Sequence, residues 1–224
     1  MKRSEINAAI QYAKAIMIKH RFYLPKFADY DLAEWKASSV CGRQEILQAH
    51  LGWDVTDFNL GNFTKCGLTL FTLRNQSPDN QKMYAEKIMV VQEQQITPMH
   101  YHWKKMEDII NRGGGNLIIR LYKRHPQTDL LDEEAELNVA IDGQYINLPT
   151  GGTVCLQPGQ SICLPPMLYH SFWAEQGVVL AGEVSMANDD LTDNRFLEPL
   201  GRFSNIEEDE KPIHLLCSDY QQYL

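Results

Sequence analysis

The feature that most constrains the fold of this sequence is a pair of histidines one residue apart, His100 and His102. Side chains alternate between the two faces of a β-strand, so residues two apart lie on the same face. In an extended segment both imidazoles therefore reach one point in space. Glu107 follows after a short polar break, and the Ile109-Ile110 pair indicates that a strand continues beyond it. Imidazoles and a carboxylate are typical ligands of a divalent transition metal with open coordination positions.

The middle of the chain, from residue 66 to residue 186, has the composition of a β-barrel. Many short strands joined by Gly, Pro and Asx turns are typical of a sandwich or small barrel rather than of alternating β-α units. The Asp142-Gly143 pair predicts a hairpin turn, and the glycine run at 113–115 is expected to turn the chain back. The predicted strands cover 67–73, 87–91, 95–100, 116–123, 136–141, 144–146, 153–157, 161–164, 170–173 and 178–186.

The two ends of the chain differ from this middle region. Ser4 is a predicted N-cap, and apolar residues at helical spacing follow it up to Met17, so that one helix face packs inward. Further short helices are predicted at 31–36 and 43–51, and residues 1–60 are expected to form a helical N-terminal cover. Residues 187–224 are acidic and irregular, which indicates a solvated surface or a strap over another subunit.

Composition narrows the class of protein. A chain of 224 residues is long enough for a single domain with a core that needs no disulfides. The net charge of −8 and the lack of a Lys/Arg cluster argue against nucleic-acid binding. Five cysteines without a C-x-x-C pair indicate reduced thiols and a cytoplasmic protein. The amphipathic start does not resemble a signal peptide, and no apolar run reaches the length of a membrane span.

A second stretch completes a recognisable pattern. The first stretch fits H-x-H-x4-E-x6-G with Gly114 as its last residue, and the second fits G-x5-P-x4-H, from Gly159 through Pro165 to His170. These motifs resemble those of the cupin superfamily. Met167 replaces a usual glycine, and Ala174 replaces an expected asparagine, which affects a turn and a secondary position.

The resemblance to cupins implies a mostly β fold, a double-stranded β-helix or jelly-roll barrel. It also implies that His100, His102, Glu107 and His170 converge on one metal ion inside that barrel. A set of three imidazoles and one carboxylate suits Mn²⁺, Fe²⁺, Co²⁺, Ni²⁺ or Zn²⁺, and ligand chemistry alone does not choose among them.

Nearly the whole chain, its helical start included, resembles the D-lyxose isomerase family. The stretches that carry this resemblance beyond the metal motifs are 182–185, Asn188-Asp189-Asp190, 193–196 and the acidic segment 206–212. The family interconverts D-lyxose and D-xylulose, and also D-mannose and D-fructose, with Mn²⁺ as the usual metal. The resemblance thus implies a monosaccharide substrate, and it agrees with a homodimer, the commonest closed assembly.

Aldose–ketose isomerisation moves a hydrogen between C1 and C2, and it needs a base as well as a metal. Proton transfer through a metal-held cis-enediol is favoured here, with a hydride shift as the alternative. Glu183 is the candidate base, because a glutamate in an otherwise apolar strand is costly unless it is used; the alternatives are a buried ion pair or an outward-facing residue. Lys105 is the candidate for stabilising an oxyanion or handing a proton to O1 or O2, although Lys104 competes and either lysine could be solvated.

Asp190 and Arg195 are the candidates for binding sugar hydroxyls from the loop after the Glu183 strand, with a plain surface position as the alternative for both. Three other functions remain open at this point, of which another sugar isomerase or epimerase is the nearest. An iron-dependent cupin dioxygenase would use the same ligand types, and a non-catalytic sugar-binding cupin would use the site for binding alone. A phosphorylated substrate is not expected, because the chain has no Gly-rich phosphate loop and no arginine cluster.

Overall fold

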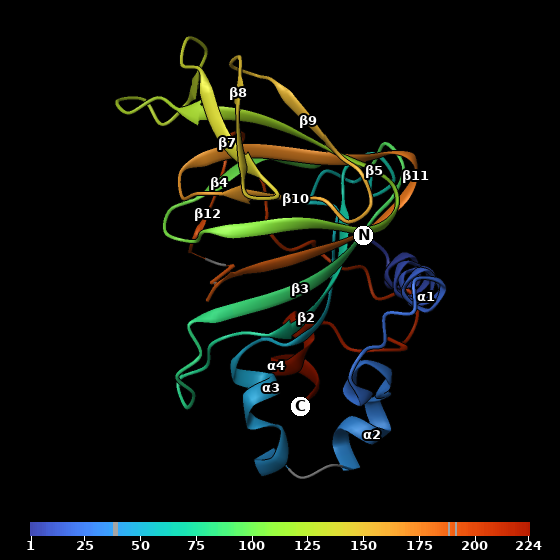
Figure 1. Cartoon of the computed structure of the whole chain (residues 1–224). Coiled ribbons are helices and arrows are strands. Elements are labelled where there is room, and N and C mark those ends of the chain that lie inside the picture. The colour runs from blue at the N-terminus through green and yellow to red at the C-terminus, as the bar shows by residue number, and fades with distance from the viewer. Residues whose placement is uncertain (38–39, 188, 191) are drawn as a thin grey trace.

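A computed structural model describes residues 1–37, 40–187, 189–190 and 192–224; Asn188, quoted above, lies outside these ranges. Twelve strands form one antiparallel sheet that curls into a barrel, and α2, α3 and α4 gather at the end of the molecule away from β7, β8 and β9 (Figure 1). The helices are α1 (Arg3–Lys19), α2 (Leu32–Ala37), α3 (Gln44–Gln48) and α4 (Tyr220–Tyr223), with short 3₁₀ turns at Lys26–Asp29, Val40–Arg43 and Cys217–Asp219. The strands are β1 (Gly52–Thr56), β2 (Leu68–Arg74), β3 (Tyr84–Val91), β4 (Thr97–His102), β5 (Glu107–Arg124), β6 (Leu131–Asp132), β7 (Leu137–Ile141), β8 (Gln144–Leu148), β9 (Thr153–Leu156), β10 (Ser161–Leu164), β11 (Leu168–Met186) and β12 (Asn194–Phe196).

The two longest strands of the barrel, β5 and β11, pair antiparallel along almost their whole length, with two register shifts. The sequence predicted that the glycine run turns the chain back. This prediction is wrong, because the run lies inside β5. Gly114 has φ of +105°, and a Cβ there would lie 2.0 Å from the carbonyl oxygen of Val178. Glycine is needed because the two strands approach closely at this bulge, not because the chain reverses.

Two apolar clusters hold the layers together. One fills the barrel, and the other lies between α1 and the outer faces of β1, β2, β3 and β11. The predicted inward face of α1 is confirmed, because its apolar residues at helical spacing are all buried. The hairpin predicted at Asp142-Gly143 is also confirmed, since both residues adopt positive φ in a two-residue turn between β7 and β8.

The N-terminal region is not helical up to residue 60, because β1 occupies Gly52–Thr56 and is buried along its whole length. Its sequence does alternate, with apolar Trp53 and Val55 between polar Asp54 and Thr56, but the stretch is only five residues long and the sequence analysis missed it. The start of α1 also differs from the prediction. The helix begins at Arg3 with Lys2 as N-cap, and Ser4 in its first turn binds the carboxylate of Asp209 through its backbone N–H and its hydroxyl.

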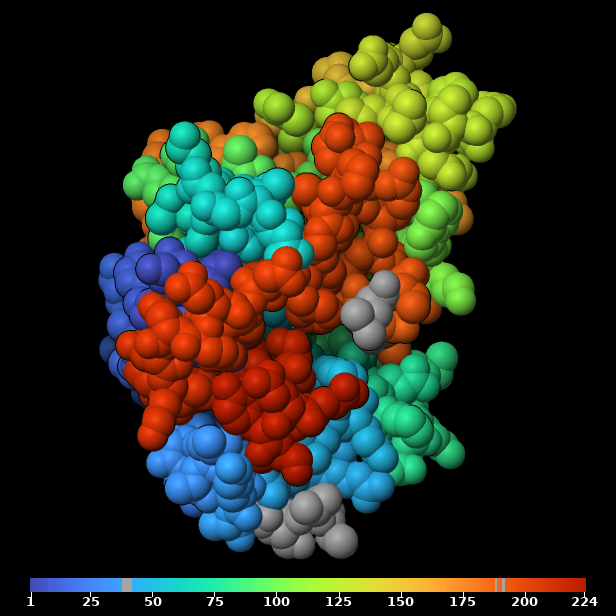
Figure 2. Space-filling model, turned by 180° about the vertical axis from the view of Figure 1, so that it is seen from behind, coloured from blue at the N-terminus to red at the C-terminus, as the bar shows by residue number. Residues whose placement is uncertain are grey.

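The acidic C-terminal segment lies over the chain's own first helix. Arg3 is fully buried and forms ion pairs with Glu208 at 2.6 Å and Asp219 at 2.8 Å. Asn7 donates to the side chain of Glu210 at 2.6 Å. Figure 2 shows the orange-to-red C-terminal residues packed against the blue N-terminal ones. Carboxylates near the start of a helix are stabilised by its exposed N–H groups and its dipole, which accounts for an acidic strap at this place.

Four cysteines are free thiols in the described part of the chain: Cys66, Cys155, Cys163 and Cys217. Cys41, the fifth, has a side chain that the structure does not describe. None of the helices in the described ranges combines the length and the apolar character needed to cross a bilayer.

Candidate metal centre and active site

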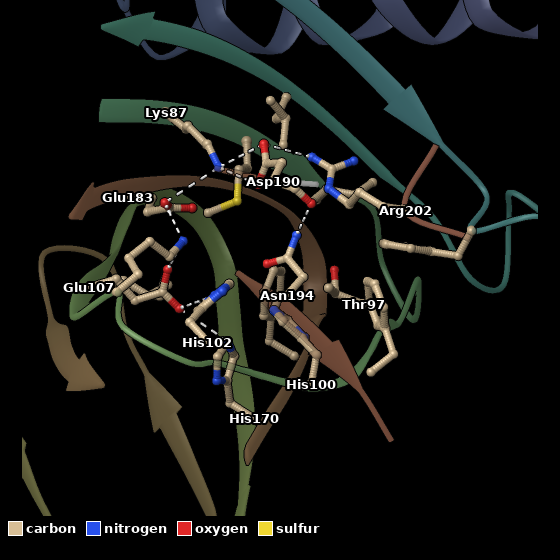
Figure 3. Close-up of a pocket in the computed structure, with 18 residues that line it drawn as sticks. Lys87, Thr97, His100, His102, Glu107, His170, Glu183, Asp190, Asn194 and Arg202 are labelled. Atoms are coloured by element: carbon tan, nitrogen blue, oxygen red, sulfur yellow. Dashed lines mark hydrogen bonds and ion pairs between the residues drawn. The ribbon is translucent and has the colours of Figure 1, made fainter. Parts of the chain in front are cut away.

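Three histidines from two neighbouring strands meet inside the barrel. His100 and His102 lie on β4, two residues apart and on one face, as the sequence predicted. His170, near the start of β11, pairs directly with His100 across the two strands. One ring nitrogen from each of the three lies within 4.8 Å of the others, and all three side chains are buried (Figure 3).

The outer ring nitrogens of two of these histidines have backbone partners. Nδ1 of His100 lies 2.7 Å from the carbonyl oxygen of Pro98, and Nδ1 of His170 lies 2.9 Å from that of Leu168. A proton on Nδ1 makes each of these contacts a hydrogen bond and leaves the lone pair of Nε2 facing the cavity. Burial lowers the pKa of His100 well below its usual value, and that of His102 as well, so neutral imidazoles are favoured.

Glu107 is the first residue of β5 and turns its carboxylate toward the histidines. Its Oε1 atom lies 3.4 Å from Nε2 of His102 and 3.1 Å from Nε2 of His170. Burial acts to raise the pKa of Glu107, but the nearby Lys105 ammonium and then His102 outweigh it and hold the pKa well below its usual range. Three imidazole nitrogens and one ionised carboxylate are a donor set that fits a divalent transition metal ion.

Lys105 lies between two carboxylates and is not a solvated turn residue. Its Nζ atom is 2.6 Å from Oε2 of Glu107 and 2.8 Å from Oε1 of Glu183. Burial acts to lower the pKa of Lys105, but the two carboxylates outweigh it, with Glu107 contributing most, and they raise the pKa. Lys104, the competing residue, is exposed. The lysine is therefore held charged beside the candidate metal ligands.

Glu183 faces the barrel interior from β11, opposite Lys87 on β3. Besides Lys105, it has the ammonium of Lys87 at 3.7 Å and accepts a hydrogen bond from the hydroxyl of Ser185 at 3.2 Å. Burial acts to raise the pKa of Glu183, but Lys105 and then Lys87 outweigh it and lower the pKa. The glutamate is thus both buried and ion-paired, and its ionised form is favoured at neutral pH.

The two residues predicted to bind hydroxyls are placed differently. Asp190 lines the pocket, where its carboxylate lies 3.1 Å from Lys87 and 3.3 Å from Arg202. Arg195 lies on β12 opposite Tyr101, whereas its neighbours Asn194 and Phe196 pair with His102 and His100. Because side chains alternate along a strand, Arg195 lies on the face away from the pocket, where it donates to the carbonyl of Phe196.

Four polar residues of the pocket were missed by the sequence analysis: Lys87, Thr97, Asn194 and Arg202. Lys87 follows Glu86 at the start of the apolar run 88–91, so it carried a weaker signal than Glu183. Asn194 was one residue away from the predicted Arg195. Arg202 carries no local signal, because it lies in an irregular segment. The apolar part of the wall comprises Phe58, Leu68, Leu70, Met89, Ile109, Phe172 and Phe196.

A barrel whose interior combines a histidine triad, a carboxylate and a ring of polar groups defines a cupin-like protein with a candidate metal centre. Known proteins agree with this class. The family model for D-lyxose isomerase matches residues 1–220. The chain is 48% identical to the D-lyxose/D-mannose isomerases of Escherichia coli O157:H7, over 228 residues, and Serratia proteamaculans, over 229 residues, with full coverage of both sequences in each case.

The chain belongs to the D-lyxose isomerase family. Solved structures of L-ribose isomerases share its fold. Those of Cellulomonas parahominis and Acinetobacter sp. DL28 superpose with TM-scores of 0.60 and 0.61 at 15% sequence identity, covering 92% of this chain and 98% of theirs. The expected cupin barrel with an N-terminal helix is thereby confirmed, and so is membership of a sugar isomerase family.

Proposed function

We propose that this protein interconverts D-lyxose and D-xylulose, and also D-mannose and D-fructose, with the help of one divalent metal ion. Family membership points to these sugars. The main support for this reaction is the buried arrangement of Glu107, Lys105 and Glu183 beside the histidine triad. It places two groups that can act as acid or base, Lys105 and Glu183, next to residues that can bind a metal ion.

In this proposal His100, His102, Glu107 and His170 hold the metal ion. When bound, a divalent cation polarises the substrate carbonyl and stabilises negative charge on neighbouring oxygens. We expect Mn²⁺ from the family resemblance, while the nitrogen and oxygen donors also accept Co²⁺, Fe²⁺, Ni²⁺ or Zn²⁺.

Glu183 is proposed as the base that removes the proton from one carbon and returns it to its neighbour through a cis-enediol. Its ionised state and its buried position in the pocket support this role. Lys105 is proposed to stabilise negative charge as it develops on the substrate oxygen. Its raised pKa favours this electrostatic role over release of its proton.

The far side of the pocket is proposed to bind the remaining hydroxyls of the sugar. Asp190, Asn194, Lys87 and Arg202 together offer both hydrogen-bond donors and acceptors there, as a polyhydroxylated ligand requires. We leave Arg195 out of this role, because its side chain lies on the opposite face of β12.

The dioxygenase and the non-catalytic binding protein are less well supported as functions. An iron-dependent dioxygenase and a non-catalytic sugar-binding cupin would both suit the donor set, but neither is suggested by a family of sugar isomerases. A charged lysine between two buried carboxylates is also a costly arrangement for binding alone.

We further propose that residues 1–224 form a single domain and that the protein is a cytoplasmic homodimer. Contacts between the acidic strap and α1 tie the two ends of the chain together, which supports one domain. The four free thiols agree with a reducing compartment. Tyr84 and Met186 pair on the outer face of the sheet and are about half exposed, with Val184 beside them, so an apolar surface is available for a second copy.

A chelate-and-restore assay tests the proposed reaction. Metal-stripped protein should convert neither D-lyxose nor D-mannose, and added Mn²⁺ should restore formation of D-xylulose and D-fructose. Full activity after complete metal removal would refute the mechanism. Oxygen uptake with Fe²⁺ and no ketose formed would favour the dioxygenase instead, and solvent deuterium in the product separates proton transfer from hydride shift.

A further inference from the structure

One buried acid near the pocket has no part in the chemistry described above. Asp54 lies in the middle of β1 and is 3% exposed. Its neighbours Trp53 and Val55 pack on the α1 side of the sheet, so alternation turns Asp54 toward the barrel. It pairs across strands with Leu70, which lines the pocket, but Asp54 itself is not in the wall. It therefore acts on a ligand only through another residue.

That other residue is Arg202. Its Nη2 atom lies 2.7 Å from Oδ2 of Asp54, and this is the ion pair that Asp54 forms within the described part of the chain. The same nitrogen lies 3.3 Å from Asp190, a carboxylate that is shared with Lys87. Asp54 is thus the nearer of the two acids. The guanidinium group also lies over the ring of Phe203, with 4.8 Å between its carbon and the ring centroid.

The other terminal nitrogen of Arg202, Nη1, suggests that this residue binds a ligand. Nη1 is buried, and no described residue offers it a hydrogen-bond acceptor. Buried donors without a partner are rare, and a ligand oxygen is one way to satisfy them. Arg202 lines the pocket on the side opposite the three histidines (Figure 3). An aldose held at its C1 end near the histidines would turn its distal hydroxyls toward this nitrogen.

We propose that Asp54 is a positioning residue for substrate binding: it fixes the guanidinium of Arg202 so that Nη1 donates to a distal hydroxyl of the sugar. A free arginine side chain has many rotamers, and a carboxylate at 2.7 Å selects one of them before the sugar arrives. The inference rests on the proposed isomerase function, and it adds a residue of β1 that does not touch the substrate.

The test is Asp54→Asn, which keeps the shape of the side chain and removes its charge. Because Arg202 lies away from the reacting carbons, it should stabilise the bound substrate and the transition state equally. Its displacement should therefore weaken substrate binding and leave the chemical step unchanged. We expect KM for D-lyxose to rise on the order of tenfold, the usual scale for a misplaced charge-assisted hydrogen bond, while kcat stays within about twofold. The Kd for D-arabinitol, the polyol obtained by reducing D-lyxose, should rise by a similar factor in calorimetry with metal-loaded protein.

Asp219→Asn is the matched control. Asp219 is buried to the same degree as Asp54 and pairs with Arg3 at 2.8 Å, but it lies outside the pocket wall. This variant should lose thermal stability and leave KM and the polyol Kd unchanged. Equal rises in KM for the two variants would show that general loosening of the barrel is responsible, and would overturn the proposal.

A double variant keeps the test decisive if Asp54→Asn folds poorly. Arg202→Met should itself raise KM, and adding Asp54→Asn to it should raise KM no further, because the residue through which Asp54 acts is gone. Additive effects, or an unchanged KM in Asp54→Asn alone, would overturn the inference and leave the isomerase function standing. Wild-type protein that binds D-arabinitol but forms no ketose would instead contradict the proposed function.

Discussion

Replacing Lys105 with methionine should reverse the way in which the stability of this protein depends on pH. The ammonium group is buried and lies 2.6 Å from Glu107 and 2.8 Å from Glu183. Methionine keeps the aliphatic stem and removes the charge, so two carboxylates stay buried without their shared cation. Removing one partner of a buried ion pair typically costs about 3–5 kcal/mol.

The structure places the expected cost near the lower end of that range. Glu183 keeps Lys87 at 3.7 Å and the hydroxyl of Ser185, and Glu107 keeps the imidazoles of His102 and His170 at 3.4 Å and 3.1 Å. We therefore expect a loss of about 3 kcal/mol at pH 7. For a chain of this length that corresponds to a fall of roughly 6–12 °C in the unfolding temperature.

The sign of the pH dependence follows from the pKa shifts. In the native protein Lys105 lowers the pKa of both glutamates, so their stabilisation is fully present above the unfolded pKa near 4.5 and is lost as the pH falls through the lower folded values. Without the lysine, burial dominates and raises both pKa values above the unfolded ones. The variant should then become less stable as the pH rises from about 4.5 toward neutrality.

The assay is thermal unfolding of metal-free protein in chelator between pH 4 and pH 8. Lys104→Met serves as control, since that lysine is exposed and should change stability by less than about 0.5 kcal/mol. Adding Glu183→Gln to Lys105→Met should recover part of the loss, because one of the two unpaired charges disappears. A Lys105→Met variant with the wild-type slope against pH would refute the ion-pair reasoning.

Three further predictions concern the site and the strap. Glu183→Gln should bind Mn²⁺ with wild-type affinity in calorimetry and lose at least about 100-fold in kcat, because a base is removed but no ligand; near-normal turnover would place the base elsewhere. His100→Ala should lose metal affinity itself, and retention of one equivalent of metal after dialysis would contradict the ligand assignment. Hydrogen bonds from Arg3 and Ser4 lower the pKa of Glu208 and Asp209, so the attachment of the strap to α1 should be intact above about pH 4.5 and be lost as the pH falls through the folded pKa values. Hydrogen exchange over residues 206–211 should then speed up on acidification, and an exchange pattern independent of pH, after correction for the intrinsic rate, would argue against this attachment.

Much of the metal centre was predictable because its information is local. Alternation along a strand places His100 and His102 on one face, and motif spacing added Glu107 and His170 through the resemblance to cupins. The cost of a charge in an apolar strand predicted that Glu183 has a function, and the structure places its side chain inside the barrel. The apolar face of α1 followed from helical spacing in the same way. Apart from Glu107 and His170, each of these predictions rested on a short stretch of sequence that sets the geometry of its own side chains.

What only the tertiary structure decided depends on partners that are distant in the chain. Lys105 is buried rather than solvated because β11 brings Glu183 beside it, 78 residues away in sequence. The glycine run of β5 continues a strand because β11 approaches it too closely for a side chain. Arg202 lines the pocket and forms ion pairs with Asp54, 148 residues away in sequence, and with Asp190. The sequence by itself determined that His100 and His102 lie on one face of a strand, since that depends on local geometry. The fold decided that Glu107 and His170 lie beside them and which charges surround the four, since burial and pairing depend on contacts between distant segments.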